Sequence, residues 1–223
     1  MISTGNDIVS LNAINITRTN NSKFYSKILS TPESKLYNEP LAATIPFENF
    51  VWLLWSIKES AFKYLQRITP DLLFTPVKFE VTQLQTPSEY KLINFGIGEL
   101  TGTGFNDESA FKAVILFGSD TLYARSFIYN ELICTVVHNS ENFGETYWGI
   151  KYINDGQYDN QSKKVREFLI QNLQRLASFD NIIIDKNQHG IPVIILGTKE
   201  MLIPASLSHH EHFIAYSFQY KRS

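Results

Sequence analysis

The chain has 223 residues, of which 43% are hydrophobic, so it is long enough to bury one sizeable core or two small ones. Its net charge of -2 gives no overall basic field, which argues against nucleic-acid binding, and no stretch approaches the roughly 18 apolar residues of a membrane span. The single cysteine, Cys134, excludes an intramolecular disulfide, and Asn6 and Asp7 interrupt any apolar leader, so we expect a cytoplasmic protein without a signal peptide.

The first part of the chain predicts a strand, a long helix and then several strands. Residues 5–9 are typical of a short strand that carries an acid. A short helix is expected at 24–29, and a second one with Thr31 as its N-cap and Pro32 at its first helical position. Apolar residues at three- and four-residue spacing predict a long helix over 46–67. The alternation that follows predicts strands at 78–84, 91–100, 111–117, 122–129 and 132–137.

The pattern restarts after Asn139, which indicates an internal repeat. The second part predicts a strand, an amphipathic helix and a set of short strands, and residues 125–133 can be aligned with 205–213. We therefore expect an α+β fold of two related lobes with quasi-twofold symmetry, residues 1–140 and 141–223, each a long helix packed on a small antiparallel sheet. The elements expected in the second lobe are a strand at 147–153, a helix at 161–178, strands at 181–184, 193–196, 204–207 and 212–220, and a hairpin turn at 187–190.

One segment of the long helix combines an apolar stripe with charge. Lys58 lies on the stripe itself, where a lysine is costly unless its ammonium group meets a partner or reaches water. Glu59 and Lys63 lie one turn apart on the adjacent flank. An ordinary i,i+4 ion pair explains these two residues, with Lys58 reaching solvent along its stem. An anion or a metal ion at this edge of the helix explains them equally well.

Three separated segments complete a set of motifs. They are Gly5-Asn6-Asp7, the helical segment Trp55-Ser56-Ile57-Lys58-Glu59-Ser60-Ala61-Phe62-Lys63, and Gly190-Ile191-Pro192 followed by Ser206-Leu207-Ser208-His209. This set resembles the signatures of the 4′-phosphopantetheinyl transferases: G-x-D, W-x-x-K-E-[SA]-x-x-K, G-x-P and S-x-S-H. Residues 24–30 also resemble the family's F-x-x-[KR]-[IV]-L-[ST] segment. In the two-lobed, surfactin-type members the last two motifs come first, so we expect a two-lobed enzyme whose lobes are swapped in sequence.

The resemblance implies a holo-[acyl-carrier-protein] synthase type of reaction, in which the phosphopantetheine arm of coenzyme A moves to a serine of an apo carrier protein. Adenosine 3′,5′-bisphosphate is released. Asp7 and Glu59 would bind Mg²⁺, and Glu59 or a water beside it would take the serine proton. Lys63 would act in catalysis and contact the pyrophosphate, with Lys58 as a second phosphate contact. The residues implied in binding coenzyme A phosphate from the other lobe are Ser208 and His209.

Val9 departs from the family pattern, because two-lobed members usually have a second acid there. The alternative is therefore a catalytically weak relative that binds coenzyme A or a carrier protein without efficient transfer. A second alternative is an unrelated α+β binding domain in which Lys58, Glu59 and Lys63 form ion pairs on the surface. His209, His210 and His212 also suggest zinc, and Ser208 with His209 a hydrolase dyad, but neighbouring strand residues face opposite ways, which disfavours both.

A carrier protein is typically acidic around the serine that is modified. Cations gather in the segment that follows the first strand, namely Arg18, Lys23, Lys27 and Lys35. They would form a modest basic rim that suits a transient, salt-sensitive encounter, although a mixed surface explains them too. We expect a monomer that binds coenzyme A and a carrier protein, and neither nucleic acid nor membrane.

Overall fold

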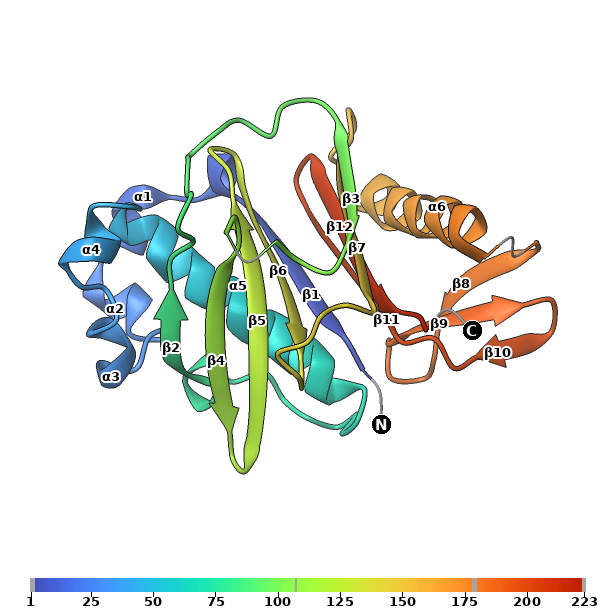
Figure 1. Cartoon of the computed structure of the whole chain (residues 1–223), viewed down its shortest axis with the longest axis horizontal. Helices are drawn as coiled ribbons and strands as arrows, with labels where there is room; N and C mark the ends of the chain where they lie inside the picture. Colours follow the sequence, from blue (N-terminus) through green and yellow to red (C-terminus); the bar gives the residue numbers. More distant parts are fainter. Residues whose placement is uncertain (1–2, 107, 178–179, 222–223) are drawn as a thin grey trace.

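The computed structural model describes residues 3–106, 108–177 and 180–221, and the chain folds into four layers (Figure 1). The outer layers are the two long helices, α5 (Phe47–Gln66) and α6 (Tyr158–Ala177). The inner layers are two antiparallel sheets that pack against each other. The α+β prediction is therefore confirmed. Within the described residues no helix is long and apolar enough to cross a membrane.

The first sheet has the strand order β1-β6-β5-β4-β2, and the second has the order β11-β12-β7-β3. A small sheet, β10-β9-β8, adjoins the second one, where β9 contacts β11. The strands of the first sheet are β1 (Gly5–Ser10), β2 (Glu80–Gln85), β4 (Phe111–Phe117), β5 (Asp120–Ile128) and β6 (Leu132–His138). The others are β3 (Glu99–Thr103), β7 (Thr146–Tyr152), β8 (Ile182–Lys186), β9 (Pro192–Leu196), β10 (Lys199–Met201), β11 (Ala205–His210) and β12 (Phe213–Gln219).

The two halves repeat one topology. In the first, the strand before the long helix pairs with the last strand of the lobe, and the order continues β5-β4-β2. In the second, β7 pairs with β12, then β11 follows, and β9 and β8 lie beyond it. Short helices occur only before α5 in the described chain. They are α1 (Ile16–Thr19), α2 (Ser22–Tyr25), α3 (Thr31–Ser34) and α4 (Glu39–Ala42), with 3-10 turns at Leu11–Ala13 and Pro76–Lys78.

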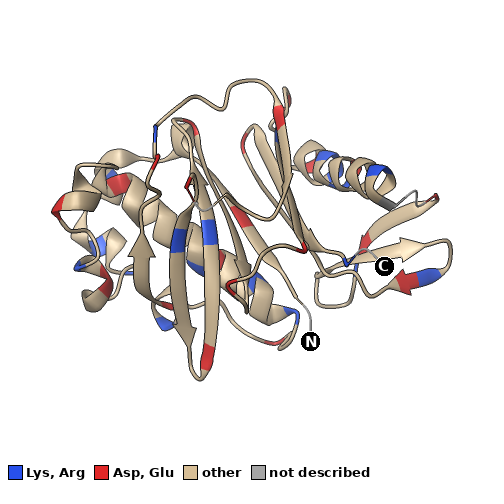
Figure 2. Cartoon of the chain, in the orientation of Figure 1, with Lys and Arg blue, Asp and Glu red and all other residues tan. Residues whose placement is uncertain are grey.

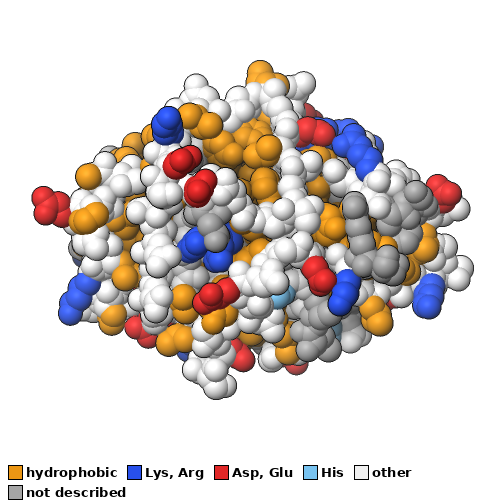
Figure 3. All heavy atoms as spheres, viewed as in Figure 1, with side chains coloured by type: hydrophobic (Ala, Val, Ile, Leu, Met, Phe, Trp, Pro, Cys, Tyr) orange, Lys and Arg blue, Asp and Glu red, His pale blue; other side chains and the backbone are white. Residues whose placement is uncertain are grey.

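Some element boundaries were predicted incorrectly. The strand expected at 91–100 forms only from Glu99, because residues 86–98 cross between the lobes as an irregular segment. This crossing also breaks the predicted boundary at residue 140, since β3 pairs with β7 in the second sheet. Hydrophobic side chains gather on the viewed face where the segment passes, and Ile97 is 84% exposed (Figure 3).

Several helix boundaries differ from those expected. The N-cap of α3 is Ser30 and not Thr31, because Ser30 forms a reciprocal capping box with Glu33. The short helix expected at 24–29 forms as α2 and ends at Tyr25. The predicted end of the second long helix, Ser178, lies outside the described residues.

Strand β1 lies at the centre of the four layers although it is an edge strand of its sheet. One face of β1 packs on α5, with Val9 in the core between them, and the other packs on β11 and β12, with Ile8 in the core between the sheets. Gly5 permits the close approach to α5, because a Cβ atom there would meet the backbone oxygen of Ser60 and lie 2.7 Å from the backbone nitrogen of Tyr64.

We predict that Gly5→Ala destabilises the protein by about 1–3 kcal/mol, the usual cost of overpacking against atoms that cannot move aside. The matched control is Gly98→Ala, where an added Cβ would have no heavy atom within 4 Å. Urea unfolding followed by circular dichroism measures both. Equal midpoints for the two variants would contradict the close approach of β1 to α5.

Candidate functional site

A cluster of two carboxylates and one lysine lies where β1 crosses α5. The Nζ atom of Lys63 is 3.1 Å from Oδ1 of Asp7 and 3.2 Å from Oε1 of Glu59. Alternation along β1 turns Gly5, Asp7 and Val9 toward the helix, and the i,i+4 spacing places Glu59 and Lys63 on one flank of α5. The structure therefore brings together three residues that the motifs singled out.

Burial dominates the electrostatics of Asp7, which is 5% exposed. It raises the pKa of Asp7 to about 7, while the charge of Lys63 lowers it and that of Glu59 raises it. Burial lowers the pKa of Lys63, but the two carboxylates more than offset this, so the net direction is upward. The cluster is thus a cation held between two acids, and another cation beside Asp7 would stabilise its ionised form.

The cluster fits a hard divalent cation that also takes ligands from outside the protein. Oδ2 of Asp7 is buried and has no hydrogen-bond partner among the described residues. Carboxylate oxygens are what Mg²⁺ prefers, and it usually keeps waters or phosphate oxygens in its octahedron. In the part of the chain that the structure describes, no three His, Cys, Asp or Glu side chains gather to hold a metal by themselves. Val9 packs in the hydrophobic core, so it adds no third ligand.

A cavity of about 210 Å³ opens beside Lys63, between the end of α5 and the second lobe. Its cations come from both lobes, and no acidic side chain is among its described lining residues. The charged or titratable residues that line it are Lys63, Arg67, Arg166, Lys186 and His209. We call this the cation cavity. Burial lowers the pKa of His209, and the charges of Lys63, Lys186 and Arg166 lower it further.

The serines of the S-x-S-H motif face β1. The backbone N–H of Asn6 donates to Oγ of Ser206 at 2.9 Å, and its side-chain amide donates to Oγ of Ser208 at 2.7 Å. Farther along, the backbone N–H of Ser10 donates to Nδ1 of His210 at 3.1 Å. The outer edge of β1 is thus satisfied by side chains of β11. Ser208 is buried at this contact and does not line the cation cavity, whereas His209 does.

The three histidines of this region have three different surroundings. His209 lies in the cation cavity, and His210 accepts from the backbone of β1. The Nδ1 atom of His212 is 3.0 Å from the carbonyl oxygen of Ile153. Glu211, with φ at 54°, turns the chain between β11 and β12, so the strand does not continue through His212.

Lys58 does not point toward the cavity, which corrects its predicted role as a phosphate contact. Its Nζ atom donates to Oε2 of Glu33 at 2.7 Å and to the carbonyl oxygen of Ile28 at 2.6 Å, and both charged side chains are 0% exposed. Burial lowers the pKa of Lys58, and the charge of Glu33 opposes this. Glu33 also accepts from the backbone N–H groups of Ser30 and Val81. The lysine on the apolar stripe therefore meets a buried carboxylate that ties α3 and β2 to α5.

An apolar cavity of about 560 Å³ lies toward the start of α5. Its walls are aromatic, with Phe24, Trp52, Trp55 and Phe74, and His210 reaches it from the second lobe. The cations at this end are Arg18 and Lys27, which line the cavity, and Lys23, which lines a shallow depression next to it. Lys35, the fourth predicted member of the basic rim, lines neither the cavity nor the depression.

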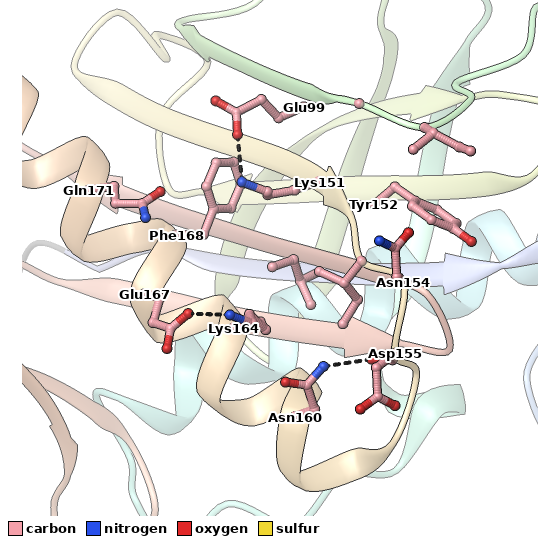
Figure 4. Close-up of a pocket in the computed structure, with 14 residues that line it drawn as sticks. Glu99, Lys151, Tyr152, Asn154, Asp155, Asn160, Lys164, Glu167, Phe168 and Gln171 are labelled. Carbon is pink, nitrogen blue, oxygen red and sulfur yellow. Dashed lines mark hydrogen bonds and ion pairs between the residues drawn. The ribbon is translucent and has the colours of Figure 1, made fainter.

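A larger cavity of about 670 Å³ lies in the second lobe, but both of its lysines are already paired with carboxylates (Figure 4). Lys151 contacts Glu99 at 2.8 Å, and Lys164 contacts Glu167 at 2.8 Å. Helix α6 shows both signs of charge along its length (Figure 2). Strand β7 contains Gly149-Ile150-Lys151, which has the same Gly-x-charged pattern as Gly5-Asn6-Asp7 in β1 but ends in a lysine and not an aspartate. This lobe therefore lacks the counterpart of Asp7, and we place the candidate site in the first lobe.

Comparison with known families finds a match over part of the chain. Residues 3–100 match the family model described as the 4′-phosphopantetheinyl transferase superfamily. The matched segment contains Asp7, Glu59 and Lys63, and the predicted resemblance to this superfamily is confirmed over it. No curated protein and no solved structure matches the chain.

Sequence reasoning missed three residues of the cation cavity, Arg67, Arg166 and Lys186. Arg67 ends α5 just beyond the recognised motif, and Arg166 is one of several cations on a mixed-charge helix. Lys186 ends β8, next to the turn that precedes the G-x-P segment. No motif marks them, because only the packing of the two lobes brings them to one cavity.

We predict that Lys58→Met costs about 3–5 kcal/mol of unfolding free energy, since it leaves Glu33 as a buried charge without its cation. Lys164→Met removes a surface ion pair with Glu167 and should cost about 1 kcal/mol or less. Urea unfolding of both variants measures this difference. A Lys58 variant as stable as the Lys164 variant would show that the buried pair contributes nothing to the fold.

Proposed function

We propose that the protein transfers the 4′-phosphopantetheine arm of coenzyme A to a serine of an apo acyl or peptidyl carrier protein and releases adenosine 3′,5′-bisphosphate. The observation that supports this most is the position of the Asp7–Lys63–Glu59 cluster beside the cation cavity. Coenzyme A carries a pyrophosphate and a 3′-phosphate, so its binding calls for several cations near a site of phosphoryl transfer. The family match over residues 3–100 gives the same class of reaction.

The residues have distinct roles in this reaction. The serine oxygen forms a bond to the phosphorus next to the pantetheine, and the bond from this phosphorus to the bridging oxygen breaks. Glu59, which is partly exposed, accepts the serine proton. Lys63 stabilises the negative charge that grows on the leaving phosphate. His209 holds a phosphate of coenzyme A together with the other cations of the cavity. Ser208 acts indirectly, because its contact with Asn6 positions β1 and thus Asp7.

Asp7 and Glu59 would hold Mg²⁺, which neutralises charge on the pyrophosphate when bound. The unpartnered Oδ2 atom of Asp7 supports this assignment. Because the protein offers two carboxylates, we expect a weak site that depends on coenzyme A to complete its ligands.

The apolar cavity at the start of α5 suits the carrier protein. It lies toward the start of α5, whereas the cation cavity lies toward its end, so a serine entering there would reach the cluster from the side away from the cations. Its aromatic walls offer a hydrophobic anchor, and Arg18, Lys23 and Lys27 add positive charge at its edge. A transient complex with an acidic carrier protein follows from this arrangement.

The test is the intact mass of an apo carrier protein after incubation with the protein, coenzyme A and Mg²⁺. We predict a gain of one phosphopantetheine with the wild type, and a loss of activity of about 100-fold or more for Glu59→Gln, which removes a general base and a metal ligand. Excess chelator should abolish the gain and added Mg²⁺ should restore it. Binding of coenzyme A without any mass gain, on several carrier proteins, would favour the catalytically weak relative.

A second prediction concerns the basic edge of the apolar cavity. Reversing the charges of Lys23 and Lys27 to Glu should raise the KM for the carrier protein roughly 10-fold at low salt, with the KM for coenzyme A unchanged. The matched control reverses Lys163 and Lys164 on α6, which lie in the other lobe. Steady-state kinetics at two salt concentrations measures both. An equal rise for both substrates would contradict the assignment of this surface.

A further inference from the structure

Arg67 occupies a position that connects the two lobes. It is the C-cap residue of α5, and its Nη2 atom donates to the carbonyl oxygens of Pro192 and Ala205, the first at 2.9 Å. These acceptors begin β9 and β11 in the second lobe. Gly190, with φ at +76°, forms the turn before Pro192 and so helps to present the carbonyl oxygen of Pro192 to Arg67. The G-x-P motif therefore has a structural partner, which is Arg67.

The guanidinium group has more donors than these two contacts use. An arginine side chain has five N–H groups in a planar fork, and among the described contacts with the second lobe only Nη2 donates. The Nε atom is buried and has no hydrogen-bond partner within the described residues. Because a buried donor without a partner is costly, the guanidinium has N–H capacity left for a ligand.

The unsatisfied edge belongs to a residue that lines the cation cavity. Lys63 lies one helical turn before Arg67 on α5, and Arg166 and Lys186 face the cavity from the second lobe. A guanidinium offers a phosphate several N–H donors in fixed directions, whereas an ammonium group binds it as a point charge.

We propose that Arg67 is a binding residue for a phosphate group of the ligand, and that the same guanidinium holds the second lobe against α5 through Pro192 and Ala205. The Nη2 atom of Arg67 holds the two walls of the cavity together, and the remaining N–H groups of the same guanidinium bind the anion. This inference rests on the proposed function for the identity of the ligand. A phosphate could be the 3′-phosphate of coenzyme A or its pyrophosphate, and the two sources are separable by experiment.

The experiment compares Arg67→Gln and Arg67→Lys with the wild type, and uses Arg175→Gln as the matched control. Arg175 is an exposed arginine on α6 whose guanidinium lies 3.7 Å from Glu99, outside the cavity. Calorimetry with adenosine 3′,5′-bisphosphate measures binding, and steady-state kinetics compares coenzyme A with 3′-dephospho-coenzyme A. The urea concentration at the midpoint of unfolding is measured for every variant as well. Binding of the bisphosphate requires no transfer, so the inference remains testable if no carrier protein is modified.

We expect Arg67→Gln to weaken bisphosphate binding and to raise the KM for coenzyme A roughly 10- to 100-fold, as for a lost charged hydrogen bond, with kcat changed far less. Arg67→Lys should lose less, and Arg175→Gln should lose nothing. A rise in KM for coenzyme A alone assigns Arg67 to the 3′-phosphate, and a rise for both substrates assigns it to the pyrophosphate.

A merely structural role predicts a different result. Both Arg67 variants would then unfold at lower urea while they bind the bisphosphate as tightly as the wild type. That outcome would overturn the inference without affecting the proposed function. Conversely, wild-type protein that binds the bisphosphate through Arg67 but modifies no carrier protein would refute the proposed function and leave the inference standing.

Discussion

The position of β1 between α5 and β11 is the constraint on which the rest of the site depends. An edge strand in the middle of a protein must satisfy its outward backbone groups, and here Ser206 and His210 accept hydrogen bonds from the backbone N–H groups of Asn6 and Ser10. Gly5 removes the side chain that would keep β1 away from the helix. Asp7 is thereby buried opposite Lys63 and Glu59, so the second lobe helps to place an acid that belongs to the first.

The two lobes repeat one topology, but within the described residues only the first has a site of this kind. Each lobe has a first strand beside a long helix, but the first lobe has Asp7 on this strand and the second has Lys151. The crossing strand β3 then supplies Glu99 as the partner of Lys151, so this lysine is neutralised within its own cavity. The cavity between the lobes, where coenzyme A would bind, has several cations and no acid among its described lining residues.

The sequence predicted the local features well and the contacts between lobes poorly. Apolar periodicity was enough for α5, and four motifs were enough for the superfamily and for the cluster around Lys63. The same periodicity could not tell that Lys58 meets Glu33, because the partner lies 25 residues away in a short helix. Arg67 and the crossing strand β3 depend on long-range packing, which no local pattern encodes. The propensity of residues 91–98 for strand was overridden in the same way.

The central claim is that Asp7 and Glu59 together form a metal site that coenzyme A completes. The most direct measurement is electron paramagnetic resonance of free Mn²⁺, a spectroscopic substitute for Mg²⁺, titrated with the protein in the presence of coenzyme A. The account predicts that Asp7→Asn weakens Mn²⁺ binding roughly 10-fold or more, because the loss of a carboxylate ligand removes a full charge from the site. Unchanged Mn²⁺ affinity in the folded Asp7→Asn protein would contradict it.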